Sequence, residues 1–463
     1  MSYKVAMLGA GSFFTDTVTE GLCHAKELFA GCDFVLMDTD RTRLQLAVDR
    51  NREIVKRMGG AIRISGATNR RQALEGCRYA VTACERNRVP YWIKDIEIPM
   101  RHGVVQYKGE NGGPGGQAHA MRNITMFMGI CADMRRVCPD AWLMNFTNPM
   151  SFLCTYFKGY GGVKALGFCH QVHGSMGVVA EMLGYEPGDL EVISGGVNHF
   201  NWPIDIRRRQ TGESCLKEFK ARVMRNKYWR RVFHNIPPQV FTREILRAFG
   251  EYPIGYDNHI CEYTPFFFAP ADWPKMGYEV PLETMRRQVR SKARWRRGAG
   301  IEALKSAEVR ARAEYHNVPF PRDGNHPYYR EKPTQVMEAF ETNRPLYLTS
   351  MVIRNDGAIG NLPADAVVDV PAVAAGGSVR GVRVGDLPTF AMELCRRQIT
   401  IHELLTEAVV HGDRGKVVQS LALDPYVRGI RQAERIADDF LRCYRWELPQ
   451  FSRRAPGFHL QGQ

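Results

Sequence analysis

Two short segments in the middle of the chain carry the residues best suited to chemistry. Residues 167–173 read GFCHQVH, and residues 195–202 read GGVNHFNW. A cysteine-histidine pair alone is more often core packing than a ligand set. However, Cys169 follows one apolar strand, residues 165–168, and His199 follows a second. A thiolate and a neutral imidazole suit a borderline divalent metal, so Cys169 and His199 are candidate ligands. Two protein ligands are too few for a structural zinc site, and the pattern predicts an open, catalytic metal site.

The N-terminal residues are typical of a dinucleotide-binding turn. An apolar strand at residues 4–8 ends at Gly9-Ala10-Gly11, where helix N-terminal amides can bind a pyrophosphate. Phe14 replaces the third glycine of the usual fingerprint. Asp38 ends the second strand, where a carboxylate binds an adenosine ribose and repels a 2′-phosphate. We expect NAD in preference to NADP, with cofactor contacts from Gly9, Gly11, Ser12, Phe13 and Asp38.

A later strand ends in the polar segment Asn145-Phe146-Thr147-Asn148-Pro149. An open α/β sheet binds its ligands at the carboxyl ends of its strands. Asparagine amides at that edge can bridge the nicotinamide ribose and substrate hydroxyls, so Asn145 is a predicted cofactor contact. The alternative is a polar turn that only precedes the next helix.

A parallel sheet would bring these segments together. We expect strands at residues 4–8, 33–37, 79–83 and 142–146, and helices at residues 15–29, 41–58, 118–137 and 173–183. Strands separated by helices predict an α/β fold, with an N-terminal Rossmann-type doubly wound parallel sheet over residues 1–195. Residues 196–463 are expected to form a C-terminal α+β domain for catalysis and oligomerisation. Its expected elements are a β-like stretch at 351–370 and helices after 386.

Composition limits the partners. The chain has 463 residues, and 63 basic against 49 acidic residues give a net charge of +14. The arginines are dispersed, and the densest run, residues 286–297, fits an exposed helix face, so we expect no nucleic-acid partner. No apolar run approaches the roughly 18 residues that a membrane helix needs. With no signal-peptide pattern and 12 scattered cysteines, a cytoplasmic protein without a membrane partner is expected.

Taken in order, the motifs resemble glycoside hydrolase family 4. The resemblance rests on Gly9 to Gly11 with Asp38, and on residues 109–116, 145–149, 167–170, 196–202, 257–263, 355–363 and 396–398, so it spans most of the chain. The family is similar to lactate and malate dehydrogenases, and its members hydrolyse glycosides with NAD and usually manganese. The resemblance implies that NAD oxidises carbon 3 of the sugar, that the proton on carbon 2 is then removed and the aglycone expelled, and that water addition and reduction complete the cycle.

The resemblance also implies roles for single residues. It gives Cys169 and His199 as metal ligands and Asn148 as a substrate contact, with Asn198 beside the metal ligand as a second one. His170 stands where some relatives carry aspartate, and it is the candidate acid for the leaving group. The alternative for His170 is a supporting partner of the metal.

The base that removes the proton from carbon 2 is less clearly marked. Tyr263 is the candidate, and Asp257 is its rival. A tyrosine base needs a lowered pKa, and Arg286 or Arg287 could supply the cation that lowers it while also contacting substrate.

The substrate class follows from the metal motif. Relatives acting on 6-phosphosugars tend to carry Cys-Asp or Cys-Asn, whereas the Cys169-His170 pair resembles members that act on unphosphorylated α-glycosides. We expect an α-hexoside, either a galactoside, a glucoside or a uronide. The net positive charge of the chain would attract an anionic substrate. The alternative is therefore a glycoside of an anionic sugar, such as a sulfonated hexoside or a 6-phosphoglycoside.

Two other classes of protein share the nucleotide-binding start. A hydroxy-acid dehydrogenase would release NADH in proportion to turnover, and a non-catalytic NAD-binding sensor would have no need of an open metal shell. A homodimer or homotetramer is the expected assembly.

Overall fold

The first six strands form one parallel sheet. In the computed structural model, which describes residues 3–12, 14–225, 240–265 and 333–452, the strand order is β3-β2-β1-β4-β5-β6, and each neighbouring pair is parallel. The strands are β1 (Lys4–Leu8), β2 (Asp33–Met37), β3 (Arg63–Ala67), β4 (Tyr79–Thr82), β5 (Trp142–Asn145) and β6 (Lys164–Gly167). This is the strand order of a doubly wound dinucleotide-binding sheet, and the predicted α/β fold is confirmed.

The helices between these strands begin and end at local signals. They are α1 (Phe14–His24), α2 (Lys26–Phe29), α3 (Arg41–Met58), α4 (Arg70–Leu74), α5 (Arg88–Arg101), α6 (Gly113–Val137), α7 (Met150–Tyr156), which continues as a π-turn over Phe157–Gly161, and α8 (Gln171–Leu183). The Asp40 side chain accepts hydrogen bonds from the backbone of Thr42 and Arg43, which caps α3. Gly59 ends that helix in a left-handed conformation that a glycine adopts without steric cost.

The C-terminal half extends the same sheet with antiparallel strands. Beyond β6 the order is β9-β10-β7-β8, and β11 pairs with β10. These strands are β7 (Leu190–Val197), β8 (Phe200–Arg208), β9 (Leu346–Arg354), β10 (Val367–Ala375) and β11 (Ser378–Gly381). The domain boundary predicted after residue 195 falls within β7, and as a division of the chain it stays a prediction.

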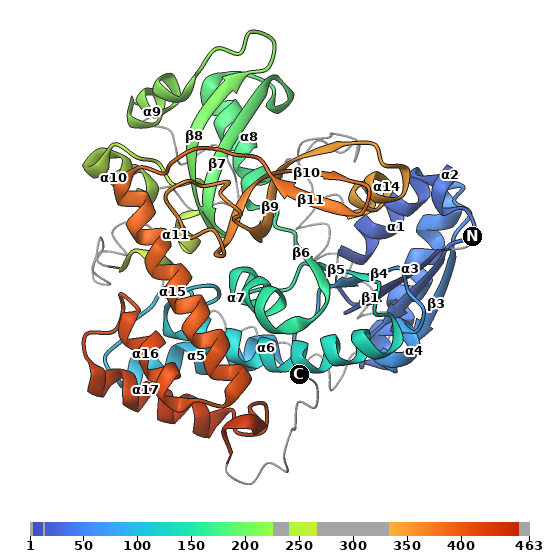
Figure 1. The fold of residues 1–463 in the computed structure, drawn as a ribbon, viewed down its shortest axis with the longest axis horizontal. Coiled ribbons are helices and arrows are strands. Elements are labelled where there is room, and N and C mark those ends of the chain that lie inside the picture. Colours follow the sequence, from blue (N-terminus) through green and yellow to red (C-terminus); the bar gives the residue numbers. More distant parts are fainter. Residues whose placement is uncertain (1–2, 13, 226–239, 266–332, 453–463) are drawn as a thin grey trace, which may run out of the picture.

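The remaining helices pack around this extension. They are α9 (Leu216–Arg225), α10 (Val240–Phe249), α11 (Asp257–Tyr263), α14 (Pro333–Thr342), α15 (Thr389–His411), α16 (Arg414–Leu423) and α17 (Ile430–Cys443), and 3-10 turns lie at Pro187–Asp189 and Pro449–Phe451. Figure 1 shows α15, α16 and α17 beside α5 and α6, so these last described helices return to the N-terminal half.

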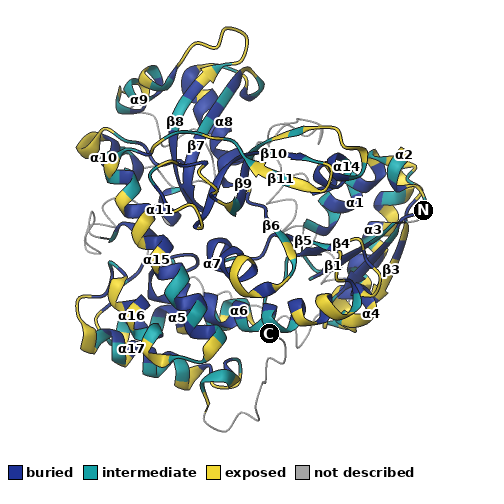
Figure 2. Cartoon of the chain, in the orientation of Figure 1, coloured by how far each residue is buried: buried dark blue, intermediate teal, exposed yellow. Residues whose placement is uncertain are grey.

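The central strands of the parallel sheet are mostly apolar because they are covered on both faces. Val5 and Met7 of β1 belong to a core that includes residues of α1, α3 and α14. Ala6 and Leu8 belong to a second core, with residues of α6, α7 and α15. A strand between two cores has no solvent face, and β1, β2, β4 and β5 are accordingly buried along most of their length, whereas the edge strand β3 is partly exposed (Figure 2).

Several element boundaries differ from the expectations. The helix expected at 15–29 is divided into α1 and α2, and the helix expected from residue 118 begins at Gly113. The stretch at 351–370 is part of two strands, β9 and β10, because a turn separates their apolar runs. Strand β3 and helices α4, α5 and α7 were not expected. The arginine run at 286–297 lies outside the described residues.

All 12 cysteines are free thiols, and 10 of them are buried. Within the described ranges, no helix has both the length and the apolar character that a membrane span needs.

One buried histidine should make the free energy of unfolding fall at acidic pH. His402 of α15 lies edge-on to Phe152 with ring centroids 4.3 Å apart, and burial lowers the pKa of His402 to about 3. Below its ordinary pKa of about 6.5, the unfolded chain binds a proton that the folded chain does not, so stability is lost as the pH falls.

We therefore expect the wild-type protein to lose about 2 kcal/mol of unfolding free energy at His402 between pH 7 and pH 5. The variant His402→Leu should lack this part of the loss, which denaturant unfolding at the two pH values measures. Equal losses in the two proteins would contradict the assignment.

Candidate active site

The turn after β1 forms the nucleotide end of the site. Gly9 has φ of +93°, and a Cβ there would lie 2.3 Å from the carbonyl oxygen of Ala83, so only glycine fits. The Asp38 carboxylate accepts hydrogen bonds from the backbone N–H of Gly11 at 3.1 Å and of Asp40 at 3.0 Å. Because β1 and β2 are parallel, this turn and Asp38 lie at the same edge of the sheet. Ser12 is half-buried in the same turn, and Phe13 lies outside the described residues.

Asn145 organises the next loop at this edge. Its side-chain oxygen accepts hydrogen bonds from the Thr82 hydroxyl at 2.9 Å and from the Thr147 backbone at 3.1 Å, and its amide donates to the Thr147 carbonyl at 3.0 Å. The side chain is therefore engaged within the protein, and its contact with the cofactor stays a prediction. Asn148, joined to Pro149 by a cis peptide bond, is half-buried.

The two candidate metal ligands lie in contact. Cys169 follows β6, and His199 lies at the tip of the β7–β8 hairpin. The Nε2 atom of His199 is 3.1 Å from the Sγ atom of Cys169, and both side chains are buried. His199 has φ of +65°, a left-handed conformation that costs a residue other than glycine about 1–2 kcal/mol. The fold thus keeps a strained residue at this position.

The electrostatic surroundings favour a metal-binding imidazole. Burial, reinforced by the nearby His259, lowers the pKa of His199 well below its usual value. The ring of His259 lies 4.1 Å from that of His199. A neutral imidazole is the form that binds a metal. In the described part of the chain, no group of three or more histidine, cysteine, aspartate or glutamate side chains could hold a metal.

A network of charged residues, which the sequence did not reveal, surrounds this pair. The Nζ atom of Lys108 is 3.0 Å from Nε2 of His259 and 2.8 Å from the carboxylate of Glu110. Arg88 pairs with both Glu110 and Glu85 at 2.5 Å. Burial acts to raise the pKa of Glu110, but Lys108 and Arg88 outweigh it and hold that pKa well below its usual range.

Glu262 belongs to the same network, on α11. Its carboxylate accepts hydrogen bonds from the backbone of Glu110 and Asn111 and lies 3.2 Å from Nδ1 of His259. Burial raises the pKa of Glu262 to about 8, against the opposing effect of Lys108. Glu110 and Glu262 stand inside motifs of the sequence analysis, but only the fold shows that α11 meets the loop before α6.

The structure separates the two candidate bases. The hydroxyl of Tyr263 donates to the carbonyl oxygen of Asn198 at 3.2 Å, next to His199 in the chain. Asp257 instead accepts hydrogen bonds from the backbone of Phe241 at 2.8 Å and Thr242 at 2.9 Å, at the start of α10. A carboxylate in that position caps a helix. Because Asp257 is engaged in this cap, the geometry favours Tyr263 over Asp257 as the base.

The remaining predicted residues lie in different surroundings. His170 is exposed at the start of α8. Asn198 is buried, and Ser151 of α7 accepts a hydrogen bond from its backbone at 3.2 Å, which ties the Asn148 loop to the hairpin turn. Arg286 and Arg287 lie outside the described residues.

Unpartnered polar atoms mark the site. Buried side-chain atoms without a hydrogen-bond partner in the described structure include Asn111 Oδ1, Gln171 Oε1, Asn198 Oδ1, His199 Nδ1 and Asn201 Oδ1. All five residues lie around the Cys169–His199 pair or the His259 network. Because buried polar atoms rarely go unpaired, a bound ligand is one source of the partners that these atoms lack.

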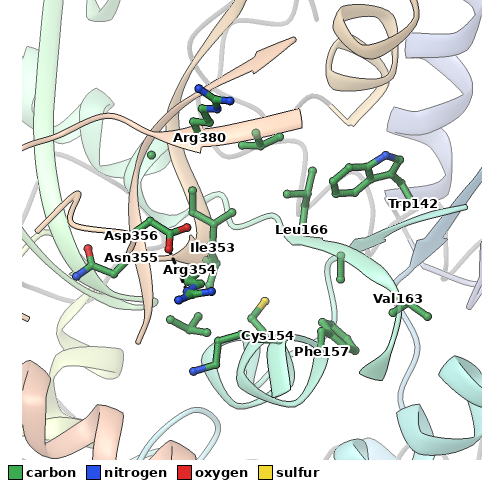
Figure 3. A pocket seen from close by; sticks show the side chains of 16 residues that line it. Trp142, Cys154, Phe157, Val163, Leu166, Ile353, Arg354, Asn355, Asp356 and Arg380 are labelled. Carbon is green, nitrogen blue, oxygen red and sulfur yellow. Dashed lines mark ion pairs between the residues drawn. The ribbon is translucent and has the colours of Figure 1, made fainter. Parts of the chain in front are cut away.

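A cavity of about 530 Å³ lies elsewhere in the molecule (Figure 3). Its lining includes Trp142 at the start of β5, Val163 just before β6, and Arg354 and Arg380 from β9 and β11. It therefore opens toward the amino ends of β5 and β6, whereas Asn145 and Cys169 follow their carboxyl ends. Among the predicted site residues that the structure describes, none lines it.

Comparison with known proteins gives the family. A model described as "Family 4 glycosyl hydrolase" matches residues 4–185, and one described as "Family 4 glycosyl hydrolase C-terminal domain" matches residues 194–427. Relatives include an alpha-galactosidase of Bacillus subtilis, 28% identical over 97% of this chain and 99% of the relative, and an alpha-glucosidase of Erwinia rhapontici, 26% identical over 95% and 97%. An alpha-galacturonidase of Bacillus subtilis is 27% identical over 75% of this chain and 77% of the relative.

A solved 6-phospho-alpha-glucosidase from gut microorganisms, in complex with NAD and Mn²⁺, has a similar fold. It superimposes with a TM-score of 0.74 and 21% identity over 98% of this chain and 100% of that chain. The chain belongs to family 4 of the glycosyl hydrolases, and the expectation of an NAD-dependent glycoside hydrolase is confirmed.

Proposed function

We propose that this enzyme hydrolyses an unphosphorylated α-hexoside, a galactoside, glucoside or uronide. The observation that carries the proposal is the Cys169-His170 pair, whose cysteine contacts His199. Within the described part of the site, the cations are also paired with carboxylates, Lys108 with Glu110 and Arg88 with Glu85 and Glu110. A paired cation is a poor anchor for a sugar phosphate. The alpha-galactosidase and alpha-glucosidase relatives support the same substrate class.

An anionic sugar is the second candidate. The chain carries a net charge of +14, and its relatives include an alpha-galacturonidase and a 6-phospho-alpha-glucosidase. A sulfonated hexoside or a 6-phosphoglycoside belongs to the same alternative. The alternative of a hydroxy-acid dehydrogenase is set aside, because the chain belongs to a glycosidase family.

The residues at the sheet edge fit NAD and a divalent metal, for which we propose Mn²⁺. Gly9 leaves no room for a side chain, as a pyrophosphate-binding turn requires, and Asp38 lies at the ribose position of such a turn. The buried His199 has one ring nitrogen beside the thiol and the other without a partner in the described structure. NAD bound at this turn would supply a hydride acceptor for carbon 3, and a divalent metal held by Cys169 and His199 would supply the positive charge that acidifies the proton on carbon 2.

Three side chains then have distinct tasks. Tyr263 removes the proton from carbon 2, and His170, exposed at the start of α8, protonates the leaving group. Burial and the nearby Glu262 raise the pKa of Tyr263 well above its usual value, so its action as a base requires a cation facing the phenol. Asn198, with its unpartnered side-chain oxygen, binds a sugar hydroxyl.

A panel of nitrophenyl glycosides tests the substrate class. With NAD and Mn²⁺ present, we expect neutral α-galactosides or α-glucosides, or the α-uronide, to be cleaved faster than sulfonated or phosphorylated hexosides. The variant Cys169→Ala serves as the background control. Activity confined to the sulfonated or phosphorylated compounds would replace the proposal with its alternative.

The exchange of the carbon 2 proton tests the base. Tyr263→Phe should slow the wash-in of solvent deuterium at carbon 2 by about 100-fold or more, because it removes the proton acceptor. Tyr426→Phe is a matched control, since the buried Tyr426 hydroxyl donates to the carbonyl of Cys261 on the same helix at 2.7 Å. Wild-type exchange in Tyr263→Phe, with loss in Asp257→Asn, would transfer the role to Asp257.

Direct metal binding tests the ligand pair. Cys169→Ala should weaken Mn²⁺ binding, followed by electron paramagnetic resonance, by roughly 100-fold or more, because it removes one of two protein ligands. Cys395→Ala removes another buried thiol, which lies 3.8 Å from the carbonyl oxygen of Phe200, and should bind Mn²⁺ as the wild type does. If Cys169→Ala retains the wild-type affinity, the assignment fails.

A further inference from the structure

The hairpin turn that carries His199 needs support from outside the hairpin. Strand β7 ends at Val197 and β8 begins at Phe200, so Asn198 and His199 alone form the connection. His199 holds a left-handed backbone conformation there, and its side chain must meet Cys169, which comes from a different part of the sheet. A strained residue persists only where its surroundings determine its position.

Asp369 of β10 supplies that support. It lies opposite Gly196 in the pairing of β10 with β7, and its side chain is 1% exposed. Its Oδ2 atom accepts a hydrogen bond from the Asn198 amide at 3.3 Å, and its carboxylate is also hydrogen-bonded by the Asn201 side chain. One buried carboxylate therefore holds residues on both sides of His199.

The third partner of this carboxylate is remote from the turn. The hydroxyl of Ser350, on β9, donates to Oδ1 of Asp369 at 2.5 Å. Burial raises the pKa of Asp369 to about 6, even though its hydrogen bonds oppose that shift. A buried carboxylate is costly for the fold, and a neutral side chain would avoid that cost.

The contact with Asp369 also sets the orientation of the Asn198 amide. A carboxylate only accepts hydrogen bonds, so the amide must direct its Nδ2 group toward Asp369. The Oδ1 atom is then the one left without a partner in the described structure. Asn198 therefore offers an acceptor, which suits a sugar hydroxyl, and its backbone carbonyl meets the hydroxyl of Tyr263.

We propose that Asp369 is a positioning residue that clamps the turn at residues 198–201, and so places His199 for the metal and fixes Asn198 as a hydrogen-bond acceptor for the substrate. This inference rests on the proposed function, because it concerns the same metal and sugar site. Asp369 touches neither of them and acts through Asn198 and Asn201.

The test measures Mn²⁺ binding by electron paramagnetic resonance, without substrate, on full-length variants. Asp369→Asn should weaken Mn²⁺ binding by about 10- to 100-fold, as loss of a group that orients a ligand does. The amide nitrogen of the new asparagine is a donor, and it would face one of the groups that now donate a hydrogen bond to Asp369. In steady-state assays at saturating Mn²⁺, the value of KM should also rise, since the Asn198 amide becomes free to turn.

Two controls separate clamping from a general effect on the fold. Ser350→Ala removes a hydrogen bond to the same carboxylate away from the turn, and it should bind Mn²⁺ within about threefold of the wild type, well short of the loss expected for a ligand-orienting group. Asp424→Asn alters another buried carboxylate, hydrogen-bonded to Gln117 at 2.9 Å, and should also retain Mn²⁺ affinity even if the melting temperature of the metal-free protein falls.

If Asp369→Asn does not fold, the variant Asn201→Ala takes its place in the test. It removes one hydrogen bond between Asp369 and the turn, and it should also weaken Mn²⁺ binding. Wild-type affinity in the folded clamp variant, together with loss in Cys169→Ala, overturns the role of Asp369 alone. Wild-type affinity in Cys169→Ala as well overturns the metal site itself, which is a failure of the proposed function.

Discussion

The contact between the Cys169 thiol and the His199 imidazole is the constraint on which the rest of the site depends. The two residues come from elements of opposite character, the end of a parallel strand and the tip of an antiparallel hairpin. They meet because β9 and β10 join the parallel and antiparallel parts into one sheet. The pairing of β10 with both β9 and β7 sets the distance between the nucleotide half and the hairpin.

Around this contact, the protein balances charge inside a buried region. Lys108 and Arg88 are paired with Glu110, and burial leaves His199 and His259 as weak bases. An imidazole that stays neutral can bind a divalent cation, because no proton occupies its nitrogen. Burial raises the pKa of the Glu262 carboxyl to about 8.

Features set by local sequence could be predicted. The glycine turn, Asp38 and the strand before Cys169 depend on neighbouring residues, and the structure places them at one edge of the sheet. Roles that depend on distant partners could not. Nothing near Asp257 in the sequence shows that it caps α10, and nothing near Lys108 shows that it meets His259. Asn145 fits the pattern of a ligand contact, yet its side chain is occupied by Thr82 and Thr147.

The central claim is that the nicotinamide of NAD and a divalent metal at Cys169 and His199 occupy one pocket. The most direct measurement is the paramagnetic relaxation of the nicotinamide protons of NAD by bound Mn²⁺. The account predicts strong relaxation enhancement that disappears in Cys169→Ala, while NAD remains bound. Unchanged nicotinamide relaxation in wild-type protein that holds both Mn²⁺ and NAD would contradict it.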